Sequence, residues 1–162
     1  MKHAGILSLV ALLVLGGCAK RVVEGPPAVK YGQDECALCG MILNEDRFAS
    51  ALLIEEDGAR SYLLFDDIGD QIQYEAKHHP SVVSRFAHDF NSRQWIIAED
   101  AVFVVSETLH TPMGSGIVAF REISDATSKA TEANGRLKQW KELQAAHSSP
   151  GKTAPCCSGH AE

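Results

Sequence analysis

Two cysteines and a methionine lie close together in the segment Cys36-Ala-Leu-Cys39-Gly-Met41. Thiolates and thioethers are soft donors, and together they favour Cu(I) over Mg²⁺, Ca²⁺ or Mn²⁺, which prefer oxygen ligands. The glycine after the second cysteine indicates a turn. The pattern therefore predicts a site for a soft metal ion in a turn.

A second methionine lies in another predicted turn, far along the chain. Met113 belongs to Thr111-Pro112-Met113-Gly114-Ser115-Gly116, where proline and glycine indicate irregular backbone. A methionine that fills a hydrophobic core usually lies inside a helix or strand, where its flexible side chain fills gaps. We therefore expect Met113 to provide a further sulfur ligand, and core packing is the alternative.

A Cys-x-x-Cys pair also permits other chemistry. In a redox pair the first thiolate is activated at a helix N-terminus, but here a glycine and a β-rich run follow Cys39. In a zinc site the missing ligands would have to be Cys156, Cys157 and His160. A structural disulfide between Cys36 and Cys39 is a third alternative. We favour copper transfer, because Cu(I) is satisfied by few ligands and leaves room for a ligand from a partner.

The histidines give weaker signals. His110 lies three residues before Met113 and could add a nitrogen ligand, and an exposed position at a strand end is the alternative. We expect His78, His79 and His88 at the surface near a helix end, where an imidazolium is favourable.

Composition limits the class of protein. A chain of 162 residues with 45% hydrophobic and 22% charged residues fits one globular domain. Fifteen basic against 21 acidic residues give a net charge of -6, so no positive charge is in surplus to neutralise phosphates. Nucleic-acid binding is therefore not expected.

The N-terminus is typical of an export signal. Lys2 precedes an apolar run over residues 4–17 that is too short to span a bilayer comfortably. The run ends at Cys18 in a pattern that resembles a bacterial lipoprotein signal, in which residues 1–17 are removed and Cys18 carries the lipid. An uncleaved anchor is the alternative. Acyl chains would hold the mature chain at a membrane, in an oxidising compartment.

The rest of the chain predicts an α+β domain over residues 31–147, between a tether at 18–30 and a disordered tail at 148–162. A hairpin is expected from strands at 48–54 and 59–65 with a turn at Asp57-Gly58.

Asp66 and Asp67 are expected mainly to cap a helix that ends before His79. A role beside the metal or facing a partner is the alternative for both carboxylates.

The second half repeats this order, which gives half-units at about 31–92 and 93–147. Two β-rich stretches lie in residues 95–105, and a further strand lies in 116–121. A long helix that begins at Ser124 or Asp125 is expected to present Leu137, Trp140 and Leu143 on one face, although Asn134-Gly135 weakens or breaks it midway. The repeat would place the two turn methionines in comparable positions.

Three motifs together resemble the NosL family of copper-binding lipoproteins, which serve in the maturation of nitrous oxide reductase. The resemblance covers Gln33 to Phe120, and the motifs are Cys36-Ala-Leu-Cys39-Gly-Met41-Ile42, Phe65-Asp66-Asp67-Ile68-Gly69, and Thr111-Pro112-Met113-Gly114-Ser115-Gly116 with Ala119-Phe120.

The resemblance implies two related ββαβ units, a Cu(I) cargo, and delivery to the reductase's multicopper centre through an inner-membrane assembly complex. By motif, Cys39, Met41 and Met113 stand at the family's ligand positions. The C-terminal cysteines and histidine are not part of the family pattern, and the residues after Gly69 are more polar than the family leads us to expect.

We therefore expect a non-enzymatic, lipid-anchored Cu(I) chaperone in the periplasm, attached to the outer membrane. Cys39, Met41 and Met113 would bind copper, Cys36 or His110 would complete the ligand shell, and a second metal ion could lie beside it. The principal alternative is a periplasmic thiol-disulfide oxidoreductase that uses the Cys-x-x-Cys pair.

Overall fold

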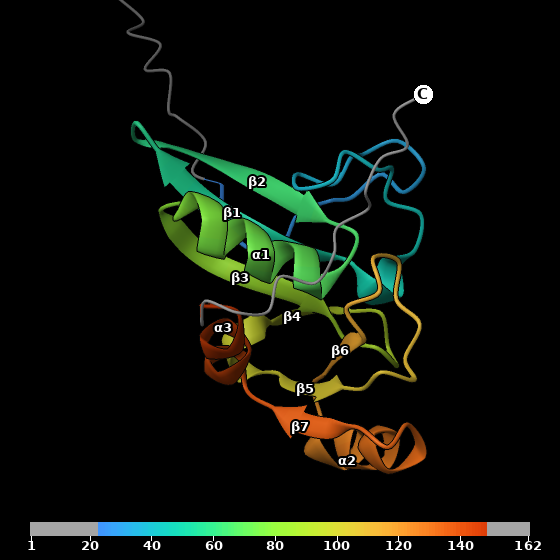
Figure 1. The fold of residues 1–162 in the computed structure, drawn as a ribbon. Coiled ribbons are helices and arrows are strands. Elements are labelled where there is room, and N and C mark those ends of the chain that lie inside the picture. The colour runs from blue at the N-terminus through green and yellow to red at the C-terminus, as the bar shows by residue number, and fades with distance from the viewer. Residues whose placement is uncertain (1–22, 149–162) are drawn as a thin grey trace, which may run out of the picture.

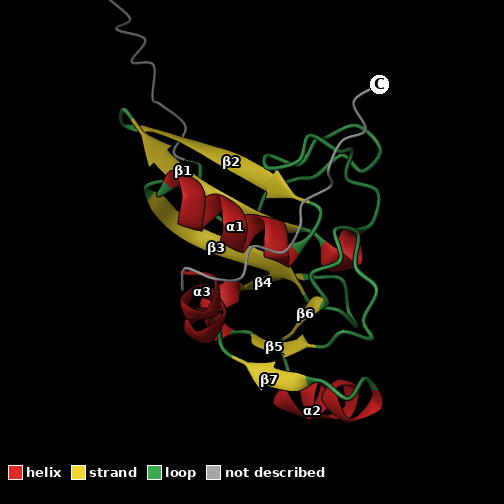
Figure 2. Cartoon of the chain, in the orientation of Figure 1, coloured by secondary structure: helices red, strands yellow, loops and turns green. Residues whose placement is uncertain are grey.

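A computed structural model describes residues 23–148 and shows two antiparallel β-sheets with three α-helices in that range (Figures 1 and 2). The predicted export signal at 1–17, residues 18–22 of the predicted tether with the lipid site Cys18, and residues 149–162 of the predicted tail lie outside the described residues. Within residues 23–148, no helix is both apolar and long enough to cross a bilayer.

The first unit is a four-stranded sheet in the order β2-β1-β3-β4, covered on one face by α1. The predicted hairpin is confirmed: β1 and β2 pair from Ser50↔Phe65 to Glu56↔Ala59. Asp57 and Gly58 both have positive φ, 51° and 71°, as a two-residue turn of this kind requires. The elements are β1 Ser50–Glu56, β2 Ala59–Phe65, α1 Ile68–His78, β3 Val82–His88 and β4 Trp95–Ile97, with 3₁₀ helices at Asp46–Phe48 and Ala98–Asp100.

The second unit has the same order of elements around a three-stranded sheet, β6-β5-β7. In both units the first strand is central, the second pairs with it as a hairpin, and the strand after the helix pairs on its other side. The predicted pair of ββαβ units is therefore confirmed. The elements are β5 Val102–Val105, β6 Ile117–Phe120, α2 Ile123–Glu132, β7 Arg136–Lys138 and the additional helix α3 Trp140–Ser148.

The predicted long C-terminal helix is broken at Asn134-Gly135, as the sequence allowed, and the expected position of Leu137 on its docking face is wrong. Helix α2 ends at Glu132, and Asn134 then adopts a left-handed conformation with φ of 48°. A Cβ atom on Gly135 would lie 2.8 Å from the Val104 side chain, so the chain can pass close to β5 only at a glycine. The following residues therefore form an edge strand, and Leu137 is 38% exposed on it.

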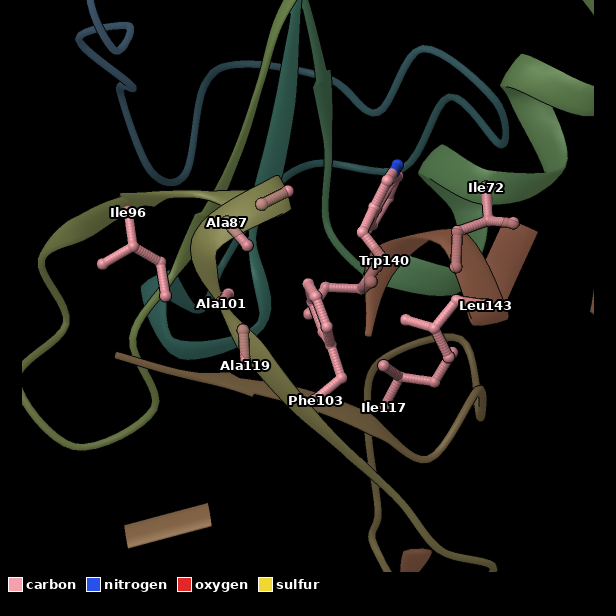
Figure 3. Close-up of a cluster of buried hydrophobic side chains, with 11 residues drawn as sticks. Ile72, Ala87, Ile96, Ala101, Phe103, Ile117, Ala119, Trp140 and Leu143 are labelled. Carbon is pink, nitrogen blue, oxygen red and sulfur yellow. The ribbon is translucent and has the colours of Figure 1, made fainter. Parts of the chain in front are cut away.

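The two units share one hydrophobic core. Trp140 and Leu143 of α3 are buried against α1 and the second sheet, as Figure 3 shows, and the Phe103 and Trp140 rings lie 5.6 Å apart between centroids. The prediction that Trp140 and Leu143 pack a helix against the core is thus correct. Because this core includes residues of both sheets, the two units are fixed relative to one another.

Residues 23–30, the end of the predicted tether, pack on the first unit. Val23 joins a cluster with Ala51 and Leu53 on one face of β1, while Leu52 faces the other cluster, which includes Tyr74 of α1. The Tyr62 hydroxyl donates a hydrogen bond to the carbonyl of Gly25 at 2.7 Å. Strand β1 is therefore apolar on both faces because each face is covered.

His88 is the last residue of β3 and is buried, so its predicted surface position is wrong. Its Nδ1 donates to the carbonyl of Arg93 at 2.8 Å, which leaves Nε2 to accept from the Tyr31 hydroxyl at 3.1 Å. The ring lies against Trp95, with 3.8 Å between centroids. His78 and His79, by contrast, are exposed at the end of α1 as expected.

Burial lowers the pKa of His88 below its ordinary value. The unfolded chain therefore binds the proton at a higher pH than the folded chain, and stability is lost as the pH falls below about 6.5. We expect the free energy of unfolding in urea to fall less between pH 7.5 and pH 5 in His88→Gln than in the wild type. Tyr31→Phe keeps the titrating ring and should retain the pH dependence. An identical slope in His88→Gln and the wild type would contradict the assignment.

Candidate metal centre

The Cys-x-x-Cys-Gly-Met segment is a closed loop attached to the end of β2. Glu35 and Ile42 form an antiparallel bridge at its base, and the Cys36 amide donates to the Met41 carbonyl at 2.8 Å. The Ala37 amide donates to the Leu64 carbonyl, also at 2.8 Å, which fixes the loop beside the residues that start α1. The predicted turn is thus positioned by backbone contacts to the first sheet.

Two carboxylates lie next to the two thiols. One donor atom from each of Cys36, Cys39, Asp66 and Asp70 lies within 4.8 Å of all the others. The Cys36 thiol donates to Asp70 Oδ2 at 3.3 Å, and the Cys39 thiol contacts Asp66 Oδ1 at 3.8 Å. Asp66 lies just before the N-cap residue Asp67 and Asp70 lies in the first turn of α1, so both carboxylates come from the start of this helix.

This environment keeps the thiols neutral when no metal is bound. Burial raises the pKa of the Cys36 thiol far above its ordinary range and also raises the pKa of Cys39, to which the negative charges of Asp66 and Asp70 contribute. Burial likewise raises the pKa of the Asp70 carboxyl. A metal ion that binds as thiolate must therefore displace the thiol protons.

Asp67 connects this site to the Met113 loop. As predicted, it caps α1: its Oδ1 accepts from the Gly69 amide at 2.8 Å. Its Oδ2 also accepts from the Thr111 hydroxyl at 2.6 Å and from the Met113 amide at 3.1 Å, while Oδ1 accepts from the Ser115 hydroxyl. The long loop between β5 and β6 therefore reaches the N-terminus of α1 (Figure 1).

Gly69 permits this close approach. A Cβ atom at that position would lie 2.5 Å from the Cβ atom of Ser115. The glycine of the Phe-Asp-Asp-Ile-Gly motif is thus explained by contact between α1 and the loop rather than by backbone conformation.

The predicted sulfur residues differ in burial. Cys36 is 2% exposed, Cys39 is half-buried, and Met41 is 53% exposed at the rim of the site. Met113 is half-buried, and His110 is exposed and not a member of the four-residue cluster.

The expected equivalence of the methionines in the two units is wrong. Met41 precedes β1, whereas Met113 lies between β5 and β6, where the first unit has only the turn at Asp57-Gly58. The second hairpin carries a long loop in place of a tight turn, and this loop brings Met113 back toward the first unit.

Sequence reasoning missed Asp70 and gave Asp66 mainly a capping role that only Asp67 performs. The available signal was the grouping of Asp66, Asp67 and Asp70 at the start of the helix that directly follows the predicted strand at 59–65. These carboxylates, and not only the C-terminal Cys156, Cys157 and His160, could complete a set of four donors around the Cys-x-x-Cys pair. Both of its cysteines are free thiols in the structure.

The fold is that of an α+β protein, and its cluster of two thiols and two carboxylates could hold a metal ion. The chain belongs to the NosL family, whose model matches residues 28–148.

It is 28% identical to the copper-binding lipoprotein NosL of Stutzerimonas stutzeri over an alignment of 157 residues. This alignment covers 88% of this chain and 81% of the relative. Its fold is similar to the crystal structure of the copper chaperone NosL from Shewanella denitrificans, with a TM-score of 0.65 and 23% identity over 75% of this chain and 97% of that chain.

The difference in burial between the thiols predicts a difference in reactivity. Thiols react as thiolates, and exposure and a lower pKa both favour reaction. We expect iodoacetamide at neutral pH to alkylate Cys39 well before Cys36, as measured by peptide mapping of the metal-free protein. In Cys39→Ser, Cys36 should still react slowly. Equal rates, or faster reaction of Cys36, would contradict the arrangement.

Proposed function

We propose that the protein is a membrane-anchored, non-enzymatic chaperone that carries Cu(I) for assembly of the multicopper centre of nitrous oxide reductase. The observation that carries the proposal is the convergence of sulfur-bearing segments from both units on the N-terminus of α1. The Cys39 thiol lies beside Asp66, and the Met113 backbone is bonded to the adjacent Asp67. The names of both relatives refer to copper, which agrees with this donor set.

The donor types favour Cu(I) at the sulfur atoms. Cys39 would bind as thiolate, and Met41 and Met113 as uncharged thioethers that need lose no proton. Cys36 or His110 would complete the ligand shell. The carboxylates are harder donors, so they accept hydrogen bonds from the thiols and leave room for a second, harder ion. Because Met41 is exposed, a partner's ligand can reach copper and remove it by ligand exchange.

Membrane attachment rests on the sequence and on the relative named as a lipoprotein. In this proposal, lipid on Cys18 holds the domain at the periplasmic side of the outer membrane. The recipients are nitrous oxide reductase and its inner-membrane assembly complex, as the family resemblance implies.

The alternative oxidoreductase is disfavoured by the electrostatics of the thiols. A reactive Cys-x-x-Cys pair needs a stabilised thiolate, usually at a helix N-terminus. Here the pair lies in a turn, and burial raises the pKa of both thiols.

Replacement of the methionines distinguishes the two functions. Leucine is similar in volume to methionine, so Met41→Leu and Met113→Leu should each cost less than about 1.5 kcal/mol of stability. We expect each to weaken Cu(I) binding, measured anaerobically by competition with a chelator, because each removes a sulfur donor. The full chain should carry Cys156→Ser and Cys157→Ser, so that only the described site is measured.

Ile42→Leu in the same loop is the matched control and should leave Cu(I) affinity unchanged. An oxidoreductase predicts the reverse, with disulfide-reductase activity that survives both methionine substitutions. Unchanged Cu(I) affinity in both methionine variants would refute the ligand assignment.

A further inference from the structure

Asp67 occupies an unusual place between the two units. Its side chain is 0% exposed, yet its hydrogen-bond donors come from α1 on one side and from the loop between β5 and β6 on the other. A buried carboxylate is tolerated only when its oxygens are well paired. The loop therefore supplies most of the hydrogen-bond donors that the buried Asp67 carboxylate needs.

The backbone conformation at Asp67 makes the adjacent carboxylates of Asp66 and Asp67 point toward different partners. Asp67 is extended, with φ of -145° and ψ of 140°, and successive side chains of an extended chain point in opposite directions. Asp66 accordingly contacts Cys39, whereas Asp67 contacts the loop. The thiol and the Met113 loop are thus held by neighbouring residues of one rigid helix start.

The loop side of the contact is made by short polar side chains. The Thr111 hydroxyl, which donates to Asp67, also accepts from the Gly116 amide at 3.2 Å. The Ser115 hydroxyl accepts from the Ile117 amide, also at 3.2 Å. Thr111 and Ser115, which lie on either side of Met113, therefore link Asp67 to backbone amides at the end of the loop, while Pro112 and Gly114 are exposed.

We propose that Asp67 is a positioning residue for copper, which acts through Thr111 and Ser115 to hold the Met113 thioether against the thiols of the first unit. This inference rests on the proposed function, because it requires Met113 to be a copper ligand. It assigns Asp67 a role beyond capping α1. Loss of an interaction that orients a metal ligand typically lowers metal affinity about 10- to 100-fold.

The test removes the two hydroxyl groups of the loop that donate to Asp67 and keeps the cap of α1. Asp67→Asn would also weaken the cap of α1, so we choose Thr111→Val together with Ser115→Ala, which leave the bond from the Gly69 amide to Asp67 intact. Cu(I) affinity is measured anaerobically by chelator competition in the wild type, the Thr111→Val/Ser115→Ala variant, Met113→Leu and the triple variant. We expect the loop variant to bind Cu(I) at least about tenfold more weakly, but to have little further effect in the Met113→Leu background.

Ser92→Ala is the matched control. Asp89 also connects the units: it accepts from the Ser92 hydroxyl at 2.7 Å and from the Arg121 amide at 2.8 Å, but it is not part of the metal cluster. Loss of the Ser92 hydroxyl should reduce stability in urea and leave Cu(I) affinity unchanged.

The outcomes separate this inference from the proposed function. If Met113→Leu weakens binding but the loop variant does not, or if the loop variant weakens binding equally in both backgrounds, Asp67 does not act through Met113 and the inference is overturned. If Met113→Leu has no effect, both the ligand assignment and the inference fail.

Discussion

The hydrogen bonds to the buried carboxylate of Asp67 are the contact on which the metal centre depends. They tie the start of α1 in the first unit to the loop that carries Met113 in the second. Gly69 makes the approach sterically possible, because any larger residue would collide with Ser115. The shared core around Phe103 and Trp140 fixes the units relative to one another, so a short contact between loop and helix can be maintained.

The N-terminus of α1 also explains why so many acidic groups can lie together. Asp66, Asp67 and Asp70 surround the positive end of the helix dipole, which favours negative charge. This partly offsets their mutual repulsion, and the thiols of Cys36 and Cys39 add hydrogen bonds without adding charge while they stay protonated. In the proposed function, copper binding as thiolate would exchange thiol protons for a cation at a site that is already rich in negative charge. Exposed Met41 leaves one side of that site open to a partner.

The elements that sequence predicted well are those set by local chemistry. Asp57-Gly58 dictates the hairpin turn and Asp67 the start of α1, and the two sulfur motifs could be found from residue type and spacing alone. The errors arose where tertiary contacts decide. Close contact between Gly135 and Val104 of β5 leads into a strand where the sequence also allowed a continued helix. The packing of Trp95 against His88 buries a histidine that was expected at the surface. Asp70 was missed because its proximity to Cys36 depends on how the cysteine loop lies on β2.

The most direct test of the account is X-ray absorption spectroscopy at the copper edge of the Cu(I)-loaded chain, with Cys156→Ser and Cys157→Ser to confine copper to the described site. The account predicts a single copper ion bound by sulfur atoms of Cys39, Met41 and Met113 and by one further donor from Cys36 or His110, with one sulfur scatterer lost in Met113→Leu. A shell dominated by oxygen from Asp66 and Asp70, or one that Met113→Leu leaves unchanged, would contradict it.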